Sequence, residues 1–308
     1  MAKAHRVRRA QDHRAGSGLS DRPVGVFDSG IGGFSVLNAL QAELPDERFV
    51  YFADTAHAPY GERGDDYVAA RTRAVTRHLV DAHDIKAMVV ACNTATAAAI
   101  HVLRVDHAAL PLVGVEPALK PAVAISRTRR IAVLATRGTL ASAKFNALLA
   151  SLAAQADFSL VPCDGLAAAI EANDAAGIAS LCARYAAAAG TFGIAAGEVD
   201  TLVLGCTHYP FVAEQLRAST GAEVHYIDTG APVAQQTRRL LAASQQLAVS
   251  ATRQEDTADA TDTTRDRTRT TLLLTSGDPS QLDAAASRWL LRSAAPAAVF
   301  SATAMAAA

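Results

Sequence analysis

The sequence predicts an α/β fold made of two similar doubly wound domains with mostly parallel central sheets, and a ligand site in the cleft between them. Short aliphatic runs alternate with longer Ala-rich segments that carry scattered Arg and Glu residues. Near-continuous apolar runs suit strands buried on both faces, and strands that alternate with helices are typical of parallel sheets. At 308 residues the chain exceeds the usual size of one domain, so we expect two compact units.

Nine aliphatic runs are predicted as strands, and the segments between them have helical length and spacing. The runs are 24–28, 49–54, 87–92, 112–116, 131–136, 158–163, 201–206, 223–228 and 271–277. Four of them lead into polar clusters: Asp28-Ser29-Gly30, Asp54-Thr55, Cys92-Asn93-Thr94 and Cys206-Thr207-His208. Ligands of open α/β sheets bind outside the carboxyl ends of the strands, so these clusters are expected at the site.

The chain also shows a weak internal sequence repeat. Residues 24–33 precede the strand that ends at Cys92, and residues 131–142 precede the strand that ends at Cys206 at a similar distance. Two related α/β units, each contributing one cysteine to a shared cleft, would explain both the internal repeat and the length of the chain. Chance resemblance between strands is the alternative.

Composition narrows the class of protein. Half of the residues are hydrophobic and the net charge is −1, which describes a globular chain and predicts neither a nucleic-acid nor a membrane partner. Residues 1–22 are basic and lack the apolar run of a secretory signal, so we expect a disordered basic extension and a cytoplasmic location; contact of its arginines with nucleic acid is the alternative. No run approaches the roughly 20 apolar residues of a membrane span.

A second polar segment interrupts the pattern near the end of the chain. Residues 252–270 are rich in Thr, Asp and Arg without apolar periodicity, which predicts a flexible surface insertion before the last strand. An acidic metal site is the alternative interpretation.

The four cysteines are widely spaced and form no C-x-x-C pair, so we expect free thiols and no structural zinc. Cys163 and Cys182 are interpreted as small hydrophobic residues. Cys92 and Cys206 end strands and are flanked by hydroxyl groups. A helix N-terminus lowers a thiol pKa, so we expect a thiolate there that acts as a nucleophile or general base.

The stretch DSGIGG, residues 28–33, invites a dinucleotide-binding interpretation. The fingerprint requires a third glycine where this chain has Ser35, and no Gly-Lys-Ser/Thr follows for a phosphate loop. We expect a tight turn whose N–H groups hold an anion such as a carboxylate, with Asp28 as a base or orienting group. The stretches 59–63 and 93–96 add polar groups for a small substrate, or are simple turns and helix caps.

Seven stretches taken together, in order, resemble the cofactor-independent aspartate/glutamate racemase superfamily, in its glutamate racemase branch. They are VGVFDSGIGGFSVL (24–37), ADTAHAPYGER (53–63), VVACNTATA (89–97), GVEPALKPA (114–122), LATRGTLAS (134–142), LVLGCTHYPF (202–211) and YIDTGAPVA (226–234). The resemblance implies racemisation of glutamate by two cysteines on opposite faces of the α-carbon, with no cofactor and no metal. It also implies a homodimer that supplies D-glutamate for peptidoglycan, and so for cell wall biogenesis and cell shape.

The resemblance also implies roles for single residues. Cys92 and Cys206 would be the two acid/base groups, with Asp28 assisting the first, and His208 and Glu171 assisting the second. Glu171 keeps the family's spacing in CDGLAAAIE (163–171), but the middle of that stretch is less apolar, so a surface helical Glu is the alternative. The implied substrate contacts are Asp28, Ser29, Tyr60, Gly61, Asn93, Thr94, Thr207 and His208.

In the family the second domain is inserted into the first. The implied division is 23–113 plus 227–300, with a flexible insertion at 246–270, and 114–226 as the second domain. Three other functions stay open: an aspartate racemase, another cysteine-dependent isomerase or hydrolase of this superfamily, and a non-catalytic amino-acid-binding protein. His208 after Cys-Thr favours glutamate over aspartate.

Overall fold

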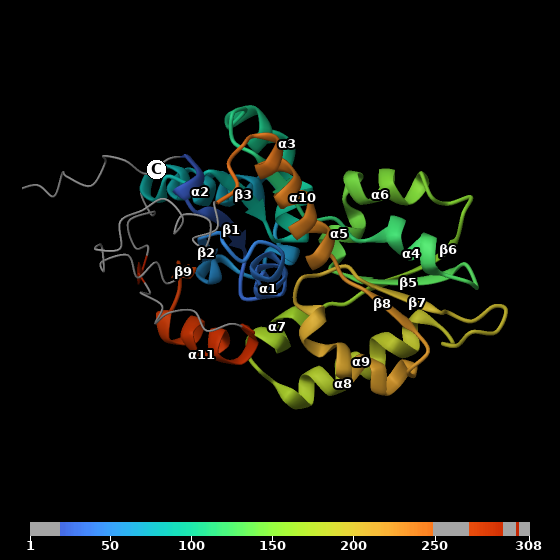
Figure 1. Cartoon of the computed structure of the whole chain (residues 1–308). Helices are drawn as coiled ribbons and strands as arrows, with labels where there is room; N and C mark the ends of the chain where they lie inside the picture. The colour runs from blue at the N-terminus through green and yellow to red at the C-terminus, as the bar shows by residue number, and fades with distance from the viewer. Residues whose placement is uncertain (1–18, 249–270, 292–299, 302–308) are drawn as a thin grey trace, which may run out of the picture.

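Two parallel sheets organise the chain, and the computed structural model describes residues 19–248, 271–291 and 300–301 (Figure 1). The first sheet has six strands in the order β10-β9-β2-β1-β3-β4, and the second has four in the order β6-β5-β7-β8. The strands of the first sheet are β1 Val24–Asp28, β2 Phe49–Ala53, β3 Ala87–Val90, β4 Leu112–Gly114, β9 Thr271–Thr275 and β10 Phe300–Ser301. Those of the second are β5 Arg130–Ala135, β6 Asp157–Pro162, β7 Thr201–Leu204 and β8 His225–Ile227.

All nine predicted strands are present, and the α/β class with parallel sheets is confirmed. The two-residue strand β10 was not predicted. The first predicted run matches β1, and the other eight end one or two residues past the observed strands, because their last residues belong to the following turns.

The two sheets repeat one topology. In the first, β1 lies between β2 and β3, and β4 follows β3. In the second, β5 lies between β6 and β7, and β8 follows β7. The order in which the strands are added therefore reverses between β1 and β3 and between β5 and β7, which are the positions where open α/β sheets bind ligands. This repeat supports the prediction of two similar units.

Helices cover both faces of each sheet, as the doubly wound class requires. The helices are α1 Phe34–Glu43, α2 Asp65–His83, α3 Asn93–Asp106, α4 Leu119–Ile125, α5 Arg137–Ala141, α6 Ala143–Ala150, α7 Leu166–Glu171, α8 Ala175–Ala189, α9 Ala213–Thr220, α10 Gly230–Ala243 and α11 Pro279–Trp289. Four 3₁₀ turns complete the described elements: η1 Leu19–Asp21, η2 Thr55–His57, η3 Tyr60–Glu62 and η4 Tyr209–Val212.

Strand residues alternate between two cores in each sheet. In the first sheet, Val26 packs with α1, α10 and α11, while its neighbour Phe27 faces α2 and α3. In the second, Leu134 packs with α7, α8 and α9, while Val133 faces α4 and α6. Because both faces are buried, the strands need apolar residues at every position, which is why they read as uninterrupted runs.

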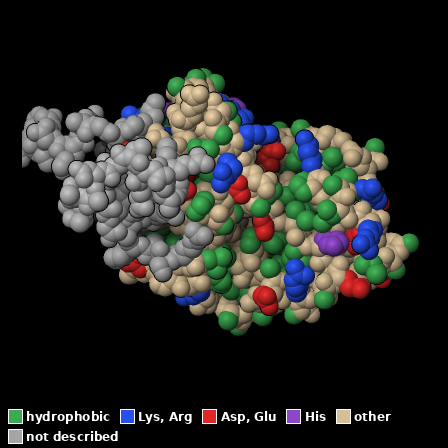
Figure 2. All heavy atoms as spheres, in the orientation of Figure 1, with side chains coloured by type: hydrophobic (Ala, Val, Ile, Leu, Met, Phe, Trp, Pro, Cys, Tyr) green, Lys and Arg blue, Asp and Glu red, His purple; other side chains and the backbone are tan. Residues whose placement is uncertain are grey.

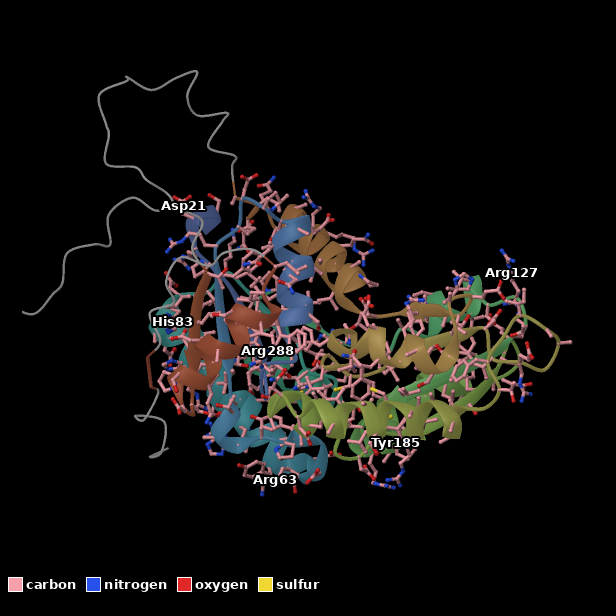
Figure 3. All side chains as sticks on the ribbon, turned by 90° about the horizontal axis from the view of Figure 1, so that it is seen from below. Asp21, Arg63, His83, Arg127, Tyr185 and Arg288 are labelled. Carbon is pink, nitrogen blue, oxygen red and sulfur yellow. The ribbon has the colours of Figure 1, made fainter. Side chains whose placement is uncertain are left out.

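The two halves lie side by side, and α10 returns from the second to cover the first (Figure 1). Asp21 and His83 lie on the first half, and Arg127 lies at the far end of the second (Figure 3). Phe211 of η4 stacks on Trp289 of α11 with ring centroids 4.6 Å apart, which joins the two halves through an aromatic contact. The division into domains at 113/114 and 226/227 stays a prediction.

Parts of the two polar segments lie outside the described residues: 1–18 of the predicted extension and 249–270 of the predicted insertion. Residues 19–22 and 246–248 are described and pack onto the first half. Among the helices that the structure describes, none is long and apolar enough to span a membrane. On the face drawn in Figure 2, basic and acidic side chains of the described residues are interspersed, in keeping with the net charge of −1.

Lys86 holds both of these described ends of the polar segments. Its side chain is fully buried, its Nζ donates to the carbonyls of Ser20 (2.6 Å) and Gln246 (2.7 Å), and it forms an ion pair with Glu47 at 2.6 Å. Glu47 Oε1 also accepts the N–H of Ala248 at 2.8 Å. Burial lowers the pKa of Lys86, and Glu47 opposes that shift. A buried charge persists only when it is paired and hydrogen-bonded in this way.

Asp200, directly before β7, organises the loop that leads into β5. Its carboxylate accepts the hydroxyl of Ser126 (2.6 Å), the N–H groups of Arg127 (2.6 Å) and Thr128 (2.9 Å), and the hydroxyl of Thr201 (2.9 Å). Burial raises the pKa of Asp200, but these hydrogen bonds outweigh it, so its pKa is lowered. The carboxylate thus serves as the common acceptor that fixes this loop.

Replacing Asp200 by asparagine is expected to reduce the free energy of unfolding by about 1–3 kcal/mol at pH 7, because two of its four donors would then face an amide NH₂ group instead of an acceptor. The folded pKa lies below the unfolded value of about 3.9, so the stabilisation is present above that pH and is lost as pH falls through the folded pKa. Urea unfolding at pH 7 and pH 3 should therefore show a difference that narrows in acid. A difference that is equal at both pH values would contradict this account.

Candidate active site

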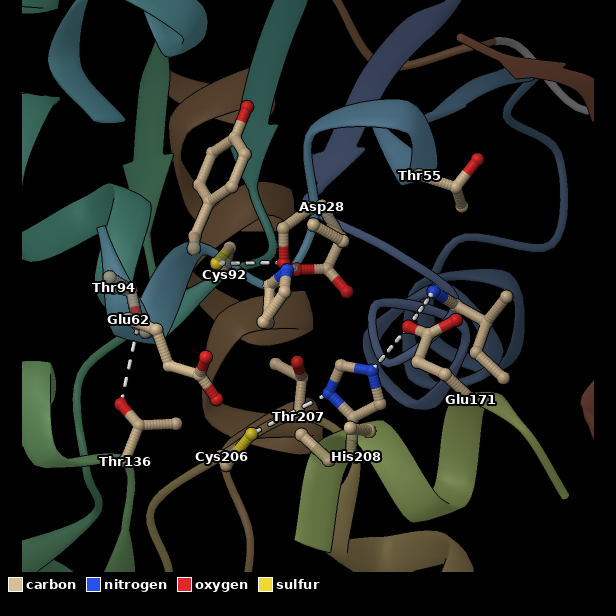
Figure 4. Close-up of a pocket in the computed structure, with 18 of the residues that line it drawn as sticks. Asp28, Thr55, Glu62, Cys92, Thr94, Thr136, Glu171, Cys206, Thr207 and His208 are labelled. Atoms are coloured by element: carbon tan, nitrogen blue, oxygen red, sulfur yellow. Dashed lines mark hydrogen bonds and ion pairs between the residues drawn. The ribbon is translucent and has the colours of Figure 1, made fainter. Parts of the chain in front are cut away.

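A cleft of about 360 Å³ lies where strands of the two sheets end (Figure 4). Asp28 ends β1 and Cys92 follows β3 on one wall, while Thr136 follows β5 and Cys206 follows β7 on the other. All of the site residues predicted from the sequence line this cleft: Asp28, Ser29, Tyr60, Gly61, Cys92, Asn93, Thr94, Glu171, Cys206, Thr207 and His208. The roles assigned to them stay predictions.

On the first wall, Cys92 lies beside Ser29 and Asp28. The Cys92 thiol donates to Ser29 Oγ at 3.7 Å, and Ser29 Oγ is 3.5 Å from Asp28 Oδ1. Asp28 is fully buried, and its Oδ2 accepts the N–H of Gly33 at 2.7 Å. Burial raises the pKa of Asp28, and the charge of His208 across the cleft opposes that shift. The Cys92 thiol is therefore linked to the Asp28 carboxyl group through the Ser29 hydroxyl.

The ionisation of Cys92 differs from the sequence expectation. Cys92 is the N-cap of α3, as predicted, but burial and the nearby charge of Asp28 raise its pKa, and the hydrogen bond from Ala95 N–H only partly opposes this. The local helix dipole is outweighed because a 6% exposed thiol loses its hydration. Burial thus favours the thiol form of Cys92, which is the proton-donating form.

On the second wall, Cys206, His208 and Glu171 form a chain of contacts. Cys206 Sγ is 3.5 Å from His208 Nδ1, and His208 Nε2 is 2.6 Å from Glu171 Oε1. Burial lowers the pKa of His208, but its hydrogen bonds and charge interactions with Cys206 and Glu171 outweigh that effect, so the pKa is raised well above its usual value. Figure 4 shows this chain facing the Cys92 wall. A protonated imidazole thus lies against the second sulfur.

The glycine turn at 28–33 holds an anion, but the anion belongs to the protein. The N–H of Ile31 donates to Glu171 Oε1 at 2.8 Å, and the N–H of Gly33 donates to Asp28. These two N–H groups are therefore occupied by carboxylates of the chain. The turn therefore holds carboxylates, as expected, and the sequence could not reveal that one of them is Glu171 of α7, which reaches across to it.

Asn93 lines the cleft with an unpartnered side-chain amide. It is 5% exposed, and neither its side-chain oxygen nor its nitrogen has a hydrogen-bond partner among the residues that the structure describes. Buried amide groups are rarely left in this state, since each unpaired group costs free energy. Next to it, Thr94 Oγ1 lies 3.3 Å from Thr136 Oγ1, a contact that joins the two walls.

A protein-family model described as Asp/Glu/hydantoin racemase matches residues 34–237. The chain belongs to the Asp/Glu/hydantoin racemase family. A glutamate racemase of Pseudomonas putida (strain W619) is 49% identical over 226 residues, which cover 73% of this chain and 84% of that protein. A glutamate racemase of Ralstonia pickettii (strain 12J) is 48% identical over 224 residues, which cover 72% of this chain and 77% of that protein.

Solved structures of this racemase family also resemble the chain. The glutamate racemase isoform RacE1 of Bacillus anthracis superposes with a TM-score of 0.74 and 27% identity, over 91% of this chain and 97% of that one. Escherichia coli glutamate racemase, in complex with L-glutamate and the activator UDP-MurNAc-Ala, gives 0.69 and 27%, over 87% and 95%. The two-sheet α/β architecture is thus shared with racemases of known structure.

In this racemase, Tyr60 contributes its ring to the cleft and directs its hydroxyl elsewhere. The hydroxyl donates to Asp54 Oδ2 at 2.5 Å, and Arg71 Nε and Nη2 bind the same carboxylate at 3.0 and 2.9 Å. Asp54 is fully buried, and burial raises the pKa of Tyr60. Direct binding of substrate by this hydroxyl is therefore not supported. Gly61 lies at the rim, close to Thr136.

Of the two supports of the racemase site, Asp54 was expected near the cleft but given no role, and Arg71 was missed. Asp54 carried a signal, since it follows a strand as Asp28 does, but no role was assigned to it. Arg71 lies on α2, and nothing in its sequence neighbourhood indicated its partner. Cys163 also lines the cleft, with its thiol donating to the Val161 carbonyl at 3.3 Å, and burial raises its pKa. All four cysteines are free, as predicted.

Proposed function

We propose that this protein interconverts L-glutamate and D-glutamate by moving the α-proton between two thiols. The observation that carries the proposal is the presence of Cys92 and Cys206 in one cleft, each from a different sheet and each beside its own acid or base groups. The relatives support glutamate as the substrate. The Pseudomonas and Ralstonia proteins are named glutamate racemases, and the Escherichia coli enzyme is in complex with L-glutamate.

Two facing thiols suit racemisation for a geometric reason. L- and D-glutamate differ in the face of the α-carbon that carries the proton, so inversion needs a base on one face and an acid on the other. One cysteine, as thiolate, takes the proton, and the other, as thiol, delivers one to the opposite face. The two cysteines exchange roles when the reaction runs in the other direction.

The neighbours of each sulfur define how its proton is managed. Burial keeps Cys92 as a thiol, and we assign Asp28 as the group that assists its ionisation when it acts as the base. On the other wall, the raised pKa of His208 keeps an imidazolium beside Cys206, and Glu171 orients that ring through Nε2. The surroundings of the two sulfurs therefore differ.

The proton to be removed is very weakly acidic, because it lies beside a carboxylate. Donors that are already in place must stabilise the charge that develops on the substrate. We assign this task to the unpartnered amide of Asn93, to Thr94 and the N-terminal turn of α3, and to Thr207. Ser29, Gly61 and the ring of Tyr60 complete the proposed contacts. The scheme draws every proton from residues of this chain, without a metal or an organic cofactor.

The cellular role follows from the product. D-glutamate is used in peptidoglycan, and the Escherichia coli enzyme is in complex with the activator UDP-MurNAc-Ala. We propose that this protein supplies D-glutamate for the cell wall as a cytoplasmic homodimer. Sedimentation equilibrium of the 32.0 kDa chain would contradict the dimer if it returned the mass of one chain.

Racemisation in deuterated water tests the proposal. With L-glutamate at early times, D-glutamate should form with deuterium at the α-carbon, because the donating thiol has exchanged with solvent. The remaining L-glutamate should stay protonated, because the abstracting thiol returns the original hydrogen when the step reverses. Circular dichroism follows inversion, and proton NMR follows exchange.

Three outcomes would reject the proposal or part of it. No racemisation of either glutamate enantiomer rejects it outright. Exchange of unreacted L-glutamate as fast as product forms indicates a single base for both faces. Faster turnover of L-aspartate than of L-glutamate in the same assay would assign the aspartate branch of the family instead.

A further inference from the structure

The turn between β1 and α1 belongs to the first sheet, yet it contacts the acid/base groups of the second. As described above, the N–H of Ile31 donates to Glu171. One residue into α1, Ser35 Oγ donates to the carbonyl of Thr207 at 2.7 Å, and it also lies 2.9 Å from the carbonyl of Gly32. Thr207 lies in the loop that carries the second thiol. The turn of the first sheet is thus bound to the second half at two separate points, which are Glu171 at the end of α7 and Thr207 in the loop beside Cys206.

Two glycines of this turn provide space for the second-sheet groups. A Cβ atom on Gly30 would lie closer than 3.0 Å to the Glu171 carboxylate, and one on Gly32 would lie closer than 3.0 Å to the His208 ring. Real Cβ atoms essentially never approach other atoms that closely. Neither glycine has a φ in the left-handed region. The backbone conformation therefore does not require them, and close approach does.

We propose that Gly30, Gly32 and Ser35 are positioning residues for proton transfer at Cys206. The turn acts as a template: Glu171 and His208 fit into the space that the glycines leave, and Ser35 fixes the main chain beside them. This inference rests on the proposed racemase function and adds residues that the resemblance did not assign to the second thiol.

The two thiols differ in how much they depend on the template. The immediate neighbours of Cys92, which are Ser29 and Asp28, follow the same sheet as Cys92 itself. The groups beside Cys206 reach their place only by docking against residues of the other sheet. Damage to the template should therefore impair proton transfer at Cys206 and spare proton transfer at Cys92.

Three variants and one control test the template. Gly32→Ala places a methyl group against the His208 ring and should lower kcat/KM roughly 100-fold, as expected for displacement of a reacting group by about 1 Å. Ser35→Ala should cost about 5-fold through one lost hydrogen bond, and Ser35→Thr, which keeps the hydroxyl, should restore most of the rate. Gly64→Ala is the matched control, since no atom of the described residues lies within 4 Å of a Cβ built there.

Rates alone cannot locate the defect. The two enantiomers have equal free energy, so any variant lowers kcat/KM by the same factor in both directions. Primary isotope effects on α-deuterated L- and D-glutamate separate the two thiols. If only Cys206 is displaced, the effect should rise for the enantiomer whose proton Cys206 removes and fall for the other. A general structural defect would move both effects together.

A second readout does not depend on turnover. Iodoacetamide labelling at pH 7, followed by mass spectrometry, should show that Gly32→Ala and Ser35→Ala slow alkylation of Cys206 at least threefold, because the imidazolium no longer lies against its sulfur. Labelling of Cys92 should be unchanged. These results support the template even if glutamate proves not to be the substrate, whereas an inactive parent rejects only the proposed function.

The template is overturned if correctly folded Gly32→Ala or Ser35→Ala protein labels Cys206 at the parental rate. It is also overturned if the two isotope effects change in parallel, or if Ser35→Thr is as impaired as Ser35→Ala. Far-UV circular dichroism and the melting temperature establish folding. If Gly32→Ala does not fold, the Ser35 pair decides the question alone.

Discussion

Alanine at Cys92 or at Cys206 is expected to lower glutamate racemisation by roughly 10⁴-fold or more, because one face of the α-carbon then lacks its acid or base. Both thiols line the same cleft and end strands of different sheets, so neither can substitute for the other. Steady-state assays from L- and from D-glutamate measure the loss in both directions.

Cys182 provides the matched control for this experiment. It is 1% exposed, packs in the core of the second sheet, and is not among the residues that line the cleft. Cys182→Ala should lose some stability and retain turnover within a few-fold of the parent. A Cys206→Ala protein that racemises glutamate at a rate near that of Cys182→Ala would rule out the two-thiol mechanism.

The largest expected effect on stability follows from Lys86. Replacing Lys86 by methionine leaves the buried Glu47 carboxylate without its partner, and breaking a buried ion pair costs about 3–5 kcal/mol. The same change removes the donor that holds the carbonyls of Ser20 and Gln246. The variant should unfold at markedly lower urea concentration and melt at lower temperature than the parent.

Two further variants separate the buried charge from the loss of a long side chain. Adding Glu47→Gln to Lys86→Met should recover part of the lost stability, since the uncompensated charge is then gone. Arg130→Met breaks a solvent-exposed pair with Asp157 and should cost no more than about 1 kcal/mol. Equal losses for Lys86→Met and Arg130→Met would show that burial of the pair is unimportant.

Much of the fold was predictable because strands that are buried on both faces of a sheet appear in the sequence as uninterrupted apolar runs. Nine strands stood out as apolar runs, and the polar residues after them marked the carboxyl edge where the cleft lies. Strand order was not predictable from periodicity, since it depends on contacts between distant segments. The short strand β10 carries too few residues to form a pattern.

In the site too, features set by local sequence motifs were predictable, and features set by tertiary contacts were not. Cys92, Cys206, Asp28 and His208 were predictable because each lies at a strand end within a recognisable motif. The direction of the Tyr60 hydroxyl was not, because its partners Asp54 and Arg71 are set by tertiary contacts. The pKa of Cys92 was predicted in the wrong direction, since sequence indicates a helix start but not the degree of burial.

The glycine turn gives the clearest case of information that only the structure holds. From the sequence, Gly30 and Gly32 predicted a tight turn whose N–H groups hold an anion. In the structure, their φ values are unexceptional, and the missing side chains make room for Glu171 and His208, which lie far along the chain.

The first sheet is assembled from both ends of the described chain, and this constrains the order in which the protein can be completed. β9 pairs with β2 through Thr271 and Phe49, whereas all four strands of the second sheet come from one continuous stretch. As the chain leaves the ribosome, the second sheet has all its strands while β2 still has an open edge. The first sheet therefore starts to form first and is completed last. The surroundings of Cys92, which follows β3, are complete only after nearly the whole chain has been synthesised.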